Sequence, residues 1–207
     1  MKYLSSLRQL FTLVTLLCCT LVVTGNSLAD DIESENPKVL MRTTDGDITI
    51  QLFADKAPIT VENFLQYVDE GYFDGTIFHR VIPNFMIQGG GFTTDLQEKA
   101  TRDPIINESR NKLHNTRGTL AMARTNDPDS ATAQFFINQR SNLQLDWSSG
   151  KEGYTVFGEV VDGMQVVDII ALSKTGPANA QTSQGQAVFQ DVPIKPIEIV
   201  SVTRLSP

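Results

Sequence analysis

The stretch "FHRVIPNFMIQGGGF", Phe78 to Phe92, joins two apolar runs that each contain a polar residue. Between the runs lies Pro83-Asn84, a pair that favours a tight turn, so the pattern predicts two short strands around that turn. Arg80 interrupts the first run and Gln88 the second. Charged and amide side chains are uncommon inside a sheet, so their presence among Phe, Val, Ile and Met side chains requires an explanation.

Alternation along a strand predicts which of these side chains share a face. The predicted faces are Phe78, Arg80 and Ile82 against His79 and Val81 in the first strand, and Met86 and Gln88 against Phe85 and Ile87 in the second. One face would therefore bring an arginine, a methionine and a glutamine together. A further segment, "AQFFINQR", adds Gln134 and Phe136 on a single side. A lone arginine in a strand is usually exposed, whereas this combination indicates a site with apolar walls and a few polar groups.

Short strands are predicted along most of the chain. Residues 38–53 contain two runs around Asp45-Gly46, a strong hairpin signal. The other predicted strands cover residues 78–82, 85–92, 118–124, 134–140, 154–161 and 194–205. Gly158, inside one of them, is expected to be a bulge or a point of close approach. Polar, turn-forming residues predict loops at residues 93–117, 126–133 and 176–193.

Two segments have helical periodicity. The first covers residues 60–70, with Thr60 as its N-cap and Gly71 as its stop. The second covers residues 162–173, and its apolar stripe consists of Met164, Val167, Ile170 and Leu172.

About eight short strands with two helices predict a mainly β fold. Such a set of antiparallel strands must protect its edges, and closing into a barrel is the usual way to do so. In the last strand, Ile197 and Ile199 share one face and Val200 and Val202 the other, which predicts that this strand is covered on both sides. The expected architecture is a closed antiparallel barrel whose ends are plugged by the two helices.

The first 29 residues have the features of a secretory signal peptide. Lys2 and Arg8 give a positive start, an apolar run follows from Leu10 to Val23, and Ser27-Leu28-Ala29 fits a cleavage site. Cleavage after Ala29 is therefore expected, with residues 30–37 as a flexible leader and residues 38–207 as the folded domain. Export without another apolar span predicts a periplasmic protein that leaves the membrane once the signal is removed.

Composition limits the classes of partner. The chain has a formal charge of −7, and Lys2 and Arg8 are two of its 17 basic residues, so the part from residue 30 carries −9. This acidity argues against binding to nucleic acid or to anionic lipid, and together with the polar loops it favours a monomer. Both cysteines, Cys18 and Cys19, lie in the predicted signal peptide, so the mature chain would have neither a disulfide nor thiolate chemistry.

The usual catalytic groups are scarce. With His79 and His114 as the only histidines, a zinc site or a Ser-His-Asp triad is not expected. The glycine-rich "QGGGF" lacks the lysine of a phosphate-binding loop. The sequence therefore implies neither a metal nor a cofactor.

Four blocks, "FHRVIPNFMIQGGGF", "RGTLAMAR", "SATAQFFIN" and "YTVFGEVVDGMQVVD", resemble the cyclophilin family of peptidyl-prolyl cis–trans isomerases. The resemblance covers about residues 38–205 and is most similar to the bacterial exported members. It implies an eight-stranded closed antiparallel barrel capped by two helices, with a substrate groove on the outside of the barrel. Its substrates would be proline-containing segments of unfolded or folding proteins.

The resemblance also implies a role for individual residues. Arg80 matches the catalytic arginine. The residues that match the proline pocket and the groove along the peptide are Phe85, Met86, Gln88, Ala123, Arg124, Gln134, Phe136, Leu145 and Tyr154. Gln144 stands where eukaryotic members carry a tryptophan that binds cyclosporin, so weak binding of that drug is implied, unless Trp147 fills the space.

Two other functions remain open at this point. A cyclophilin-like barrel could grip proline-containing or unfolded segments as a chaperone, with incidental catalysis. A structural barrel in a larger assembly would need a large exposed apolar patch, of which the polar loops give no sign. The cation at Arg80 favours the enzyme, because a binding module does not need a charge at that position.

Overall fold

The computed structural model describes residues 36–206. In chain order, its elements are β1 Lys38–Thr43, β2 Gly46–Leu52, α1 Pro58–Asp69, β3 Thr76–Ile82, β4 Met86–Thr93, β5 Thr119–Met122, β6 Phe135–Asn138, the 3-10 helix η1 Leu143–Leu145, β7 Val156–Asp162, α2 Met164–Ala171, β8 Thr175–Thr182, β9 Gly185–Pro193 and β10 Glu198–Leu205. The predicted signal peptide and almost all of the leader lie outside the described residues. None of the helices within residues 36–206 is long and apolar enough to span a membrane.

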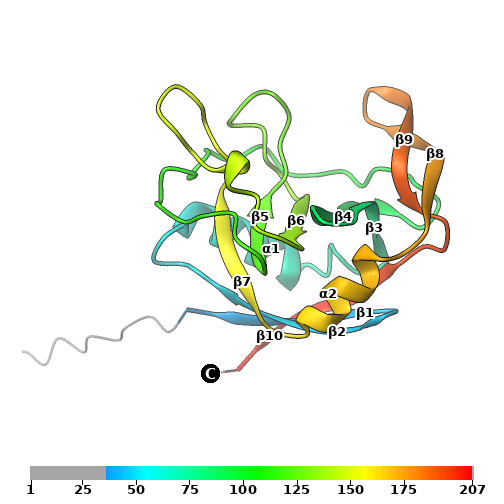
Figure 1. Cartoon of the computed structure of the whole chain (residues 1–207), viewed down its shortest axis with the longest axis horizontal. Coiled ribbons are helices and arrows are strands. Elements are labelled where there is room, and N and C mark those ends of the chain that lie inside the picture. The colour runs from blue at the N-terminus through cyan, green and yellow to red at the C-terminus, as the bar shows by residue number, and fades with distance from the viewer. Residues whose placement is uncertain (1–35, 207) are drawn as a thin grey trace, which may run out of the picture. The chain divides into compact units, whose positions relative to one another are not determined.

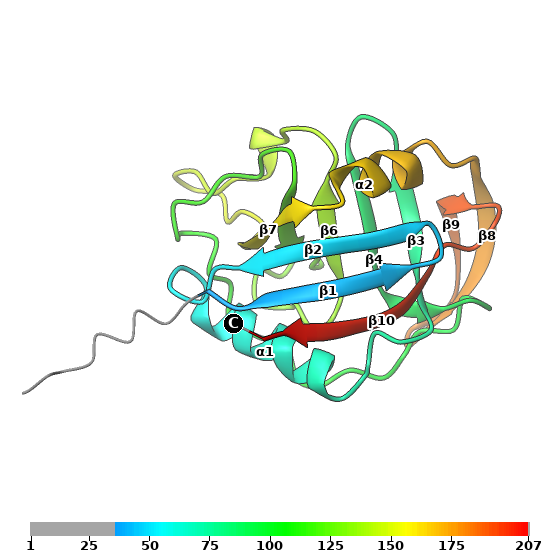
Figure 2. The same ribbon diagram turned by 90° about the horizontal axis from the view of Figure 1, so that it is seen from below.

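Eight of these strands form a closed barrel in the order β1-β10-β3-β4-β6-β5-β7-β2 (Figure 1). Every neighbouring pair is antiparallel, and the barrel closes where β1 pairs with both β2 and β10. In the view of Figure 2, α1 and α2 lie on opposite sides of the β2–β1–β10 strands. The predicted mainly β fold, with its eight-stranded barrel and two helices, is confirmed.

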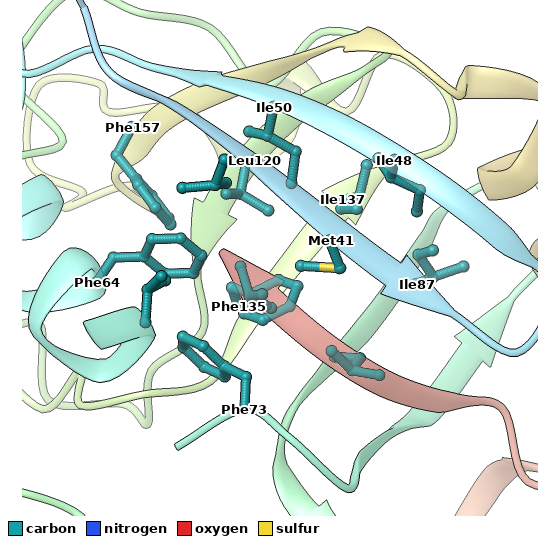
Figure 3. Close-up of a cluster of buried hydrophobic side chains, with 14 of the residues drawn as sticks. Met41, Ile48, Ile50, Phe64, Phe73, Ile87, Leu120, Phe135, Ile137 and Phe157 are labelled. Carbon is teal, nitrogen blue, oxygen red and sulfur yellow. The ribbon is translucent and has the colours of Figure 1, made fainter. Parts of the chain in front are cut away.

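The interior of the barrel is filled by aliphatic and aromatic side chains from the strands and from both helices (Figure 3). Phe64 of α1 lies among Phe73, Phe135 and Phe157, with ring centroids 5.0, 5.9 and 5.3 Å away. Rings at these separations add edge and tilted contacts to the burial of their area. The interior is therefore a packed core, and a substrate must bind elsewhere.

The first helix begins earlier than predicted and is capped by a distant residue. Pro58 is its first residue, which suits proline because that position needs no N–H donor, and no side chain of the helix or its N-cap residue forms the cap. Instead, the carboxylate of Glu108 accepts hydrogen bonds from the backbone N–H groups of Ile59 and Thr60 and from the Thr60 hydroxyl. The prediction of Thr60 as N-cap was wrong, because a carboxylate 48 residues away satisfies these donors.

The second helix is shorter than predicted, and its buried side differs. Val166, Val167, Ile170 and Ala171 are buried, whereas Leu172 is 78% exposed. Leu172 follows the last helical residue, so it does not belong to the apolar stripe in which helical spacing had placed it.

Bulges change which side chains face the core. In β3, Phe78 pairs with Gly89 and Arg80 with Gln88, so His79 is an extra residue without a partner in β4. Both Phe78 and Val81 consequently point into the barrel, contrary to the simple alternation. Arg80 remains on the outer side.

A bulge in β10 likewise overturns the prediction that this strand is covered on both sides. Thr43 pairs with Ile199 and Arg42 with Ser201, so Val200 is the extra residue. Ile199 and Val202 are both buried, and Val200 is exposed. The strand therefore buries one face only. The bulge shifts the alternation by one residue, so buried side chains fall on what the sequence pattern had assigned to opposite faces.

Residues 176–193 were predicted to be a loop, and this was wrong. They lie in a two-stranded antiparallel sheet, β8–β9, that is separate from the barrel and projects from it (Figure 1). Gly185 adopts a φ of +113° where the hairpin turns, a conformation that favours glycine.

Gly158 behaves as expected of a close approach. A Cβ atom at this position would lie 2.7 Å from the backbone oxygen of Gln51. A side chain would therefore force β2 and β7 apart.

Candidate functional site

A small cavity of about 110 Å³ opens on the outside of the barrel. It is lined by Arg80, Phe85, Met86, Gln88, Ala123, Arg124, Phe136, Leu145 and Tyr154. Nine of the ten residues that the sequence motifs singled out thus meet in one place. Its volume suits a single compact apolar group rather than a large ligand.

Strand pairing brings the central residues together. Arg80 of β3 pairs with Gln88 of β4, which in turn pairs with Phe136 of β6. Paired residues in antiparallel strands place their side chains on the same face, about 5 Å apart. The two strands of one hairpin and a third strand that is distant in the sequence therefore present a cation, an amide and an aromatic ring side by side.

The predicted turn at Pro83-Asn84 is present and places Phe85 at the cavity. Asn84 has a φ of +58°, and the N–H of Phe85 donates to the carbonyl of Ile82 at 3.1 Å. Proline followed by a residue with positive φ is the pattern of a type II turn, and asparagine tolerates that conformation. Because Phe85 precedes the regular strand, it packs on the same side as Met86, not opposite to it as alternation predicted.

The two glutamines form a pair beside the cavity. The side-chain Nε2 of Gln88 donates to Oε1 of Gln134 at 3.1 Å. Gln134 does not line the cavity itself, so it differs in this respect from the other predicted residues. Its contact leaves one N–H of the Gln88 amide for another acceptor.

Arg124 closes another side of the site. Its guanidinium lies 4.5 Å from the ring centroid of Tyr154 and donates to the backbone oxygens of Thr125, Glu152 and Gly153 at 2.7–3.2 Å. The N–H of Tyr154 also donates to the carbonyl of Leu145 at 2.9 Å. The loop that carries two walls of the cavity is therefore fastened to the end of β5.

The motifs did not reveal a network of buried amides behind the cavity. Asn142 donates to the backbone oxygen of Phe85 and to Oδ1 of Asn138, while Asn138 donates to Asn115 and to Thr119. All three asparagines are buried, so their hydrogen bonds are costly to break. They hold the turn of Phe85 against the neighbouring segments, and no local sequence pattern distinguishes them from loop asparagines.

Asp146, which follows Leu145, extends this network. Burial alone would raise the pKa of its carboxyl group, but hydrogen bonds from the backbone and side chain of Asn115 and from His114 outweigh that effect and lower the pKa. The His114 Nδ1 atom lies 2.7 Å from Asp146 Oδ2. The charged carboxylate thereby anchors the segment that carries Leu145.

His79 occupies a different environment from Arg80, its neighbour in sequence. Its imidazole is buried between the rings of Phe92 and Phe189, with centroids 4.7 and 5.8 Å away. Burial lowers the pKa of His79 to about 4, so the ring is neutral at pH 7. It lies outside the barrel core but does not line the cavity.

The cavity can hold a small apolar group beside two guanidinium groups, those of Arg80 and Arg124. The Tyr154 phenol is the only hydroxyl or thiol that lines it. Within residues 36–206, no group of three or more His, Cys, Asp or Glu side chains is placed to hold a metal ion. Gln144 and Trp147 do not line the cavity; both are exposed, and Arg110 lies 5.7 Å from the Trp147 ring centroid. Trp147 therefore does not fill the space where Gln144 departs from the family pattern.

Comparison with known proteins gives a consistent result. A model of the cyclophilin type peptidyl-prolyl cis-trans isomerase/CLD family matches residues 38–204. A peptidyl-prolyl cis-trans isomerase of Acinetobacter baylyi is 52% identical over 181 residues, which cover 87% of this chain and 92% of the relative. Peptidyl-prolyl cis-trans isomerase B of Escherichia coli is 54% identical over 168 residues, which cover 80% of this chain and 98% of the relative.

Solved structures agree with the sequence comparisons. A cyclophilin type peptidyl-prolyl cis-trans isomerase of Cryptosporidium parvum, crystallised in the presence of the dipeptide Ala-Pro, has a TM-score of 0.66 and 27% sequence identity. The alignment covers 82% of this chain and 99% of the other. From its sequence, its barrel and its relatives, the chain belongs to the cyclophilin family and is a peptidyl-prolyl cis–trans isomerase.

Proposed function

We propose that Arg80 catalyses rotation about X–Pro peptide bonds by donating a hydrogen bond to the prolyl nitrogen of the twisted amide. The observation that carries this proposal is that Arg80, paired with Gln88 across two strands, lines a cavity that also has apolar walls. No covalent bond is made or broken, so the reaction needs neither a nucleophile nor a metal.

The physical basis is the electronic change during rotation. A planar amide is stabilised by resonance, which gives a barrier of about 18–20 kcal/mol. As the amide twists, resonance is lost and the prolyl nitrogen regains a lone pair. A guanidinium aimed at that nitrogen then stabilises the twisted form and not the planar one, which is the requirement for lowering a barrier.

The rest of the site would hold the two sides of the bond. Phe85, Met86, Phe136 and Leu145 supply apolar walls that would keep the proline ring still. Gln88, Gln134 and the backbone near Ala123 are suited to binding the carbonyl side of the substrate. Lowering the barrier by about 7 kcal/mol would accelerate rotation on the order of 10⁵-fold.

Replacing Arg80 by alanine tests this role directly. We expect Arg80→Ala to lose most of its activity on an Ala-Pro peptide, roughly 10²-fold or more in kcat/KM, because the donor to the twisted amide is removed. Arg42→Ala is a matched control, since Arg42 is an exposed arginine on β1. Circular dichroism would establish that both variants are folded.

The outcomes separate an enzyme from a binding module. Full activity in folded Arg80→Ala would refute the proposed role. If neither wild type nor variant turned over the peptide while both still bound it, the protein would be a chaperone-like binder and Arg80 an affinity residue.

We also propose that the protein acts on exported proteins in the periplasm and assists their folding. The support is the signal-like pattern of residues 1–29, with its positive start, apolar run and small-residue cleavage site. Expression of the full chain in a Gram-negative host should yield a periplasmic product whose N-terminus is Asp30. A cytoplasmic product that retains Lys2 and Arg8 would contradict this proposal.

A further inference from the structure

The β8–β9 hairpin presents one of its two faces to the barrel. Along β9, Ala187, Phe189 and Asp191 are partly buried, whereas Gln186, Val188 and Gln190 are exposed. This period of two is that of a strand with one covered face. A bulge follows Phe189 in β9, so alternation alone does not give the direction of Asp191. The contacts of the two side chains show that both lie next to β3.

Phe189 anchors the hairpin on the barrel. Its ring centroid lies 5.1 Å from that of Phe92, in an edge-on arrangement, and 5.8 Å from that of His79. Ala180 of β8 is buried in the same small apolar cluster, next to Ile77 and Phe92. The base of this cluster is the bulge at His79, the residue directly before Arg80 in β3.

Asp191, two residues after Phe189, reaches Arg80. Its Oδ2 atom lies 4.0 Å from Nε of Arg80, and the two side chains are 41% and 45% exposed. Asp191 does not line the cavity, so it approaches the guanidinium from outside the site. The separation is longer than a hydrogen bond, and the interaction is therefore a through-space attraction between charges.

We propose that Asp191 is a positioning residue for Arg80 and that the β8–β9 hairpin serves to present it. The inference rests on the proposed function of Arg80. An arginine side chain has many rotamers, and fixing it for catalysis is costly in entropy. A carboxylate on the Nε side restricts the guanidinium while its terminal nitrogens remain free to face the cavity.

The order of the side-chain contacts along the two strands supports this pairing. On β3 the consecutive residues are His79 and Arg80, and on β9 the partners are Phe189 and Asp191. The ring contact and the charged contact therefore follow one another along the same two strands. Displacing the ring should move the carboxylate away from Arg80.

Asp191→Asn keeps the shape of the side chain and removes its charge. Exposed ion pairs are worth little, so we expect a modest effect, roughly a three- to tenfold decrease in kcat for an Ala-Pro peptide with KM within about twofold. Asp191→Glu should restore most of the activity because it restores the charge. High salt, about 1 M, should reduce the difference between wild type and Asp191→Asn, since it screens the attraction.

Two neighbouring residues of β9 provide a matched pair. Phe189→Ala should reproduce the kinetic effect of Asp191→Asn although the carboxylate is intact. Val188→Ala, on the exposed face of the same strand, should leave kcat and KM unchanged. Circular dichroism of each variant would verify its fold.

A double-mutant cycle tests whether Asp191 acts through Arg80. In the Arg80→Ala background, Asp191→Asn should have no further effect on kcat. The same loss in both backgrounds would overturn the inference, because Asp191 would then act independently of Arg80.

The remaining outcomes distinguish the two proposals. An unchanged kcat in folded Asp191→Asn, together with an inactive Arg80→Ala, would overturn the inference and leave the proposed function intact. Full activity in Arg80→Ala would overturn both.

Discussion

His79 and Arg80 are consecutive residues with opposite surroundings. The bulge at His79 turns the imidazole under the hairpin, while Arg80 remains at the rim of the cavity. The combination of Arg80 with Met86 and Gln88 on one predicted face indicated a site, and the resemblance to the cyclophilins implied the catalytic role of Arg80. It did not predict the burial of His79, which depends on Phe189 more than 100 residues later in the chain.

The buried histidine should make stability depend on pH. The pKa of His79 is lowered from 6.5 to about 4, so below pH 6.5 the unfolded chain binds a proton that the folded chain does not. Stability should therefore decrease as pH falls from about 6.5 towards 4, by about 2 kcal/mol at about pH 5. Urea unfolding of wild type and His79→Gln across this range would measure the difference.

Comparing wild type with His79→Gln separates the contribution of the histidine to the pH dependence of stability from that of the carboxyl groups that also titrate in acid. We expect the free energy of unfolding of His79→Gln to decline less steeply between about pH 6.5 and 5 than that of the wild type. Parallel curves for the two proteins would show that the protonation of His79 does not contribute.

Elements were predicted well where the signal was local and poorly where it was not. Pro83-Asn84 forms the expected turn, because the turn chemistry resides in the pair itself. The hairpin expected at Asp45-Gly46 also forms, but one residue earlier: Thr44 and Asp45 make the turn and Gly46 pairs with Thr43. Residues 176–193 were predicted to be a loop because they are rich in Gly, Pro, Ser, Asn and Gln, yet they pair along their length. In the sequence, the aromatic residue Phe189 was the one strong indication that this segment packs against the rest of the protein, and its side chain is partly buried.

Arg124 should control the loop that carries Leu145 and Tyr154. Arg124→Ala would remove its hydrogen bonds to three backbone oxygens and its contact with the Tyr154 ring. We expect KM for an Ala-Pro peptide to rise roughly three- to tenfold, because the loss of one or two net hydrogen bonds loosens two walls of the cavity. Hydrogen exchange should become faster at the amide of Tyr154, which donates to Leu145.

Arg110→Ala provides the control for the Arg124→Ala experiment. Arg110 pairs with the side chain of Glu152 on the same loop, but at an exposed site. Exposed pairs contribute little, so we expect KM and exchange to stay near wild type. Equal effects from Arg110→Ala and Arg124→Ala would assign the result to a general disturbance of the loop.

At the scale of the whole molecule, the number of strands and the need to protect edges led to the barrel. The order of its strands was not predictable in the same way. β3 lies next to β10, and β5 next to β7, through pairings between distant segments that no local pattern encodes. The site depended on that order, because Gln88 and Phe136 meet only through the pairing of β4 with β6.

The barrel wall separates stability from catalysis, and β6 offers a direct test of this separation. Phe135 points into the core, where its ring lies 5.6 Å from that of Phe73, whereas Phe136 lines the cavity next to Tyr154. Phe135→Leu should lower the free energy of unfolding by about 1–2 kcal/mol and leave KM unchanged. Phe136→Leu should raise KM several-fold with a smaller loss of stability, since it alters the wall that would hold the proline ring.

Urea unfolding and peptide kinetics on the two variants would measure both quantities. The two substitutions remove the same atoms from adjacent residues of one strand, so they differ only in the side of the wall that they affect. A rise in KM for Phe135→Leu equal to that of Phe136→Leu would mean that repacking of the core is transmitted to the site. The barrel wall would then deform when the core is altered and would change the shape of the cavity. A rigid wall would keep a change in the core from reaching the cavity on its outer face.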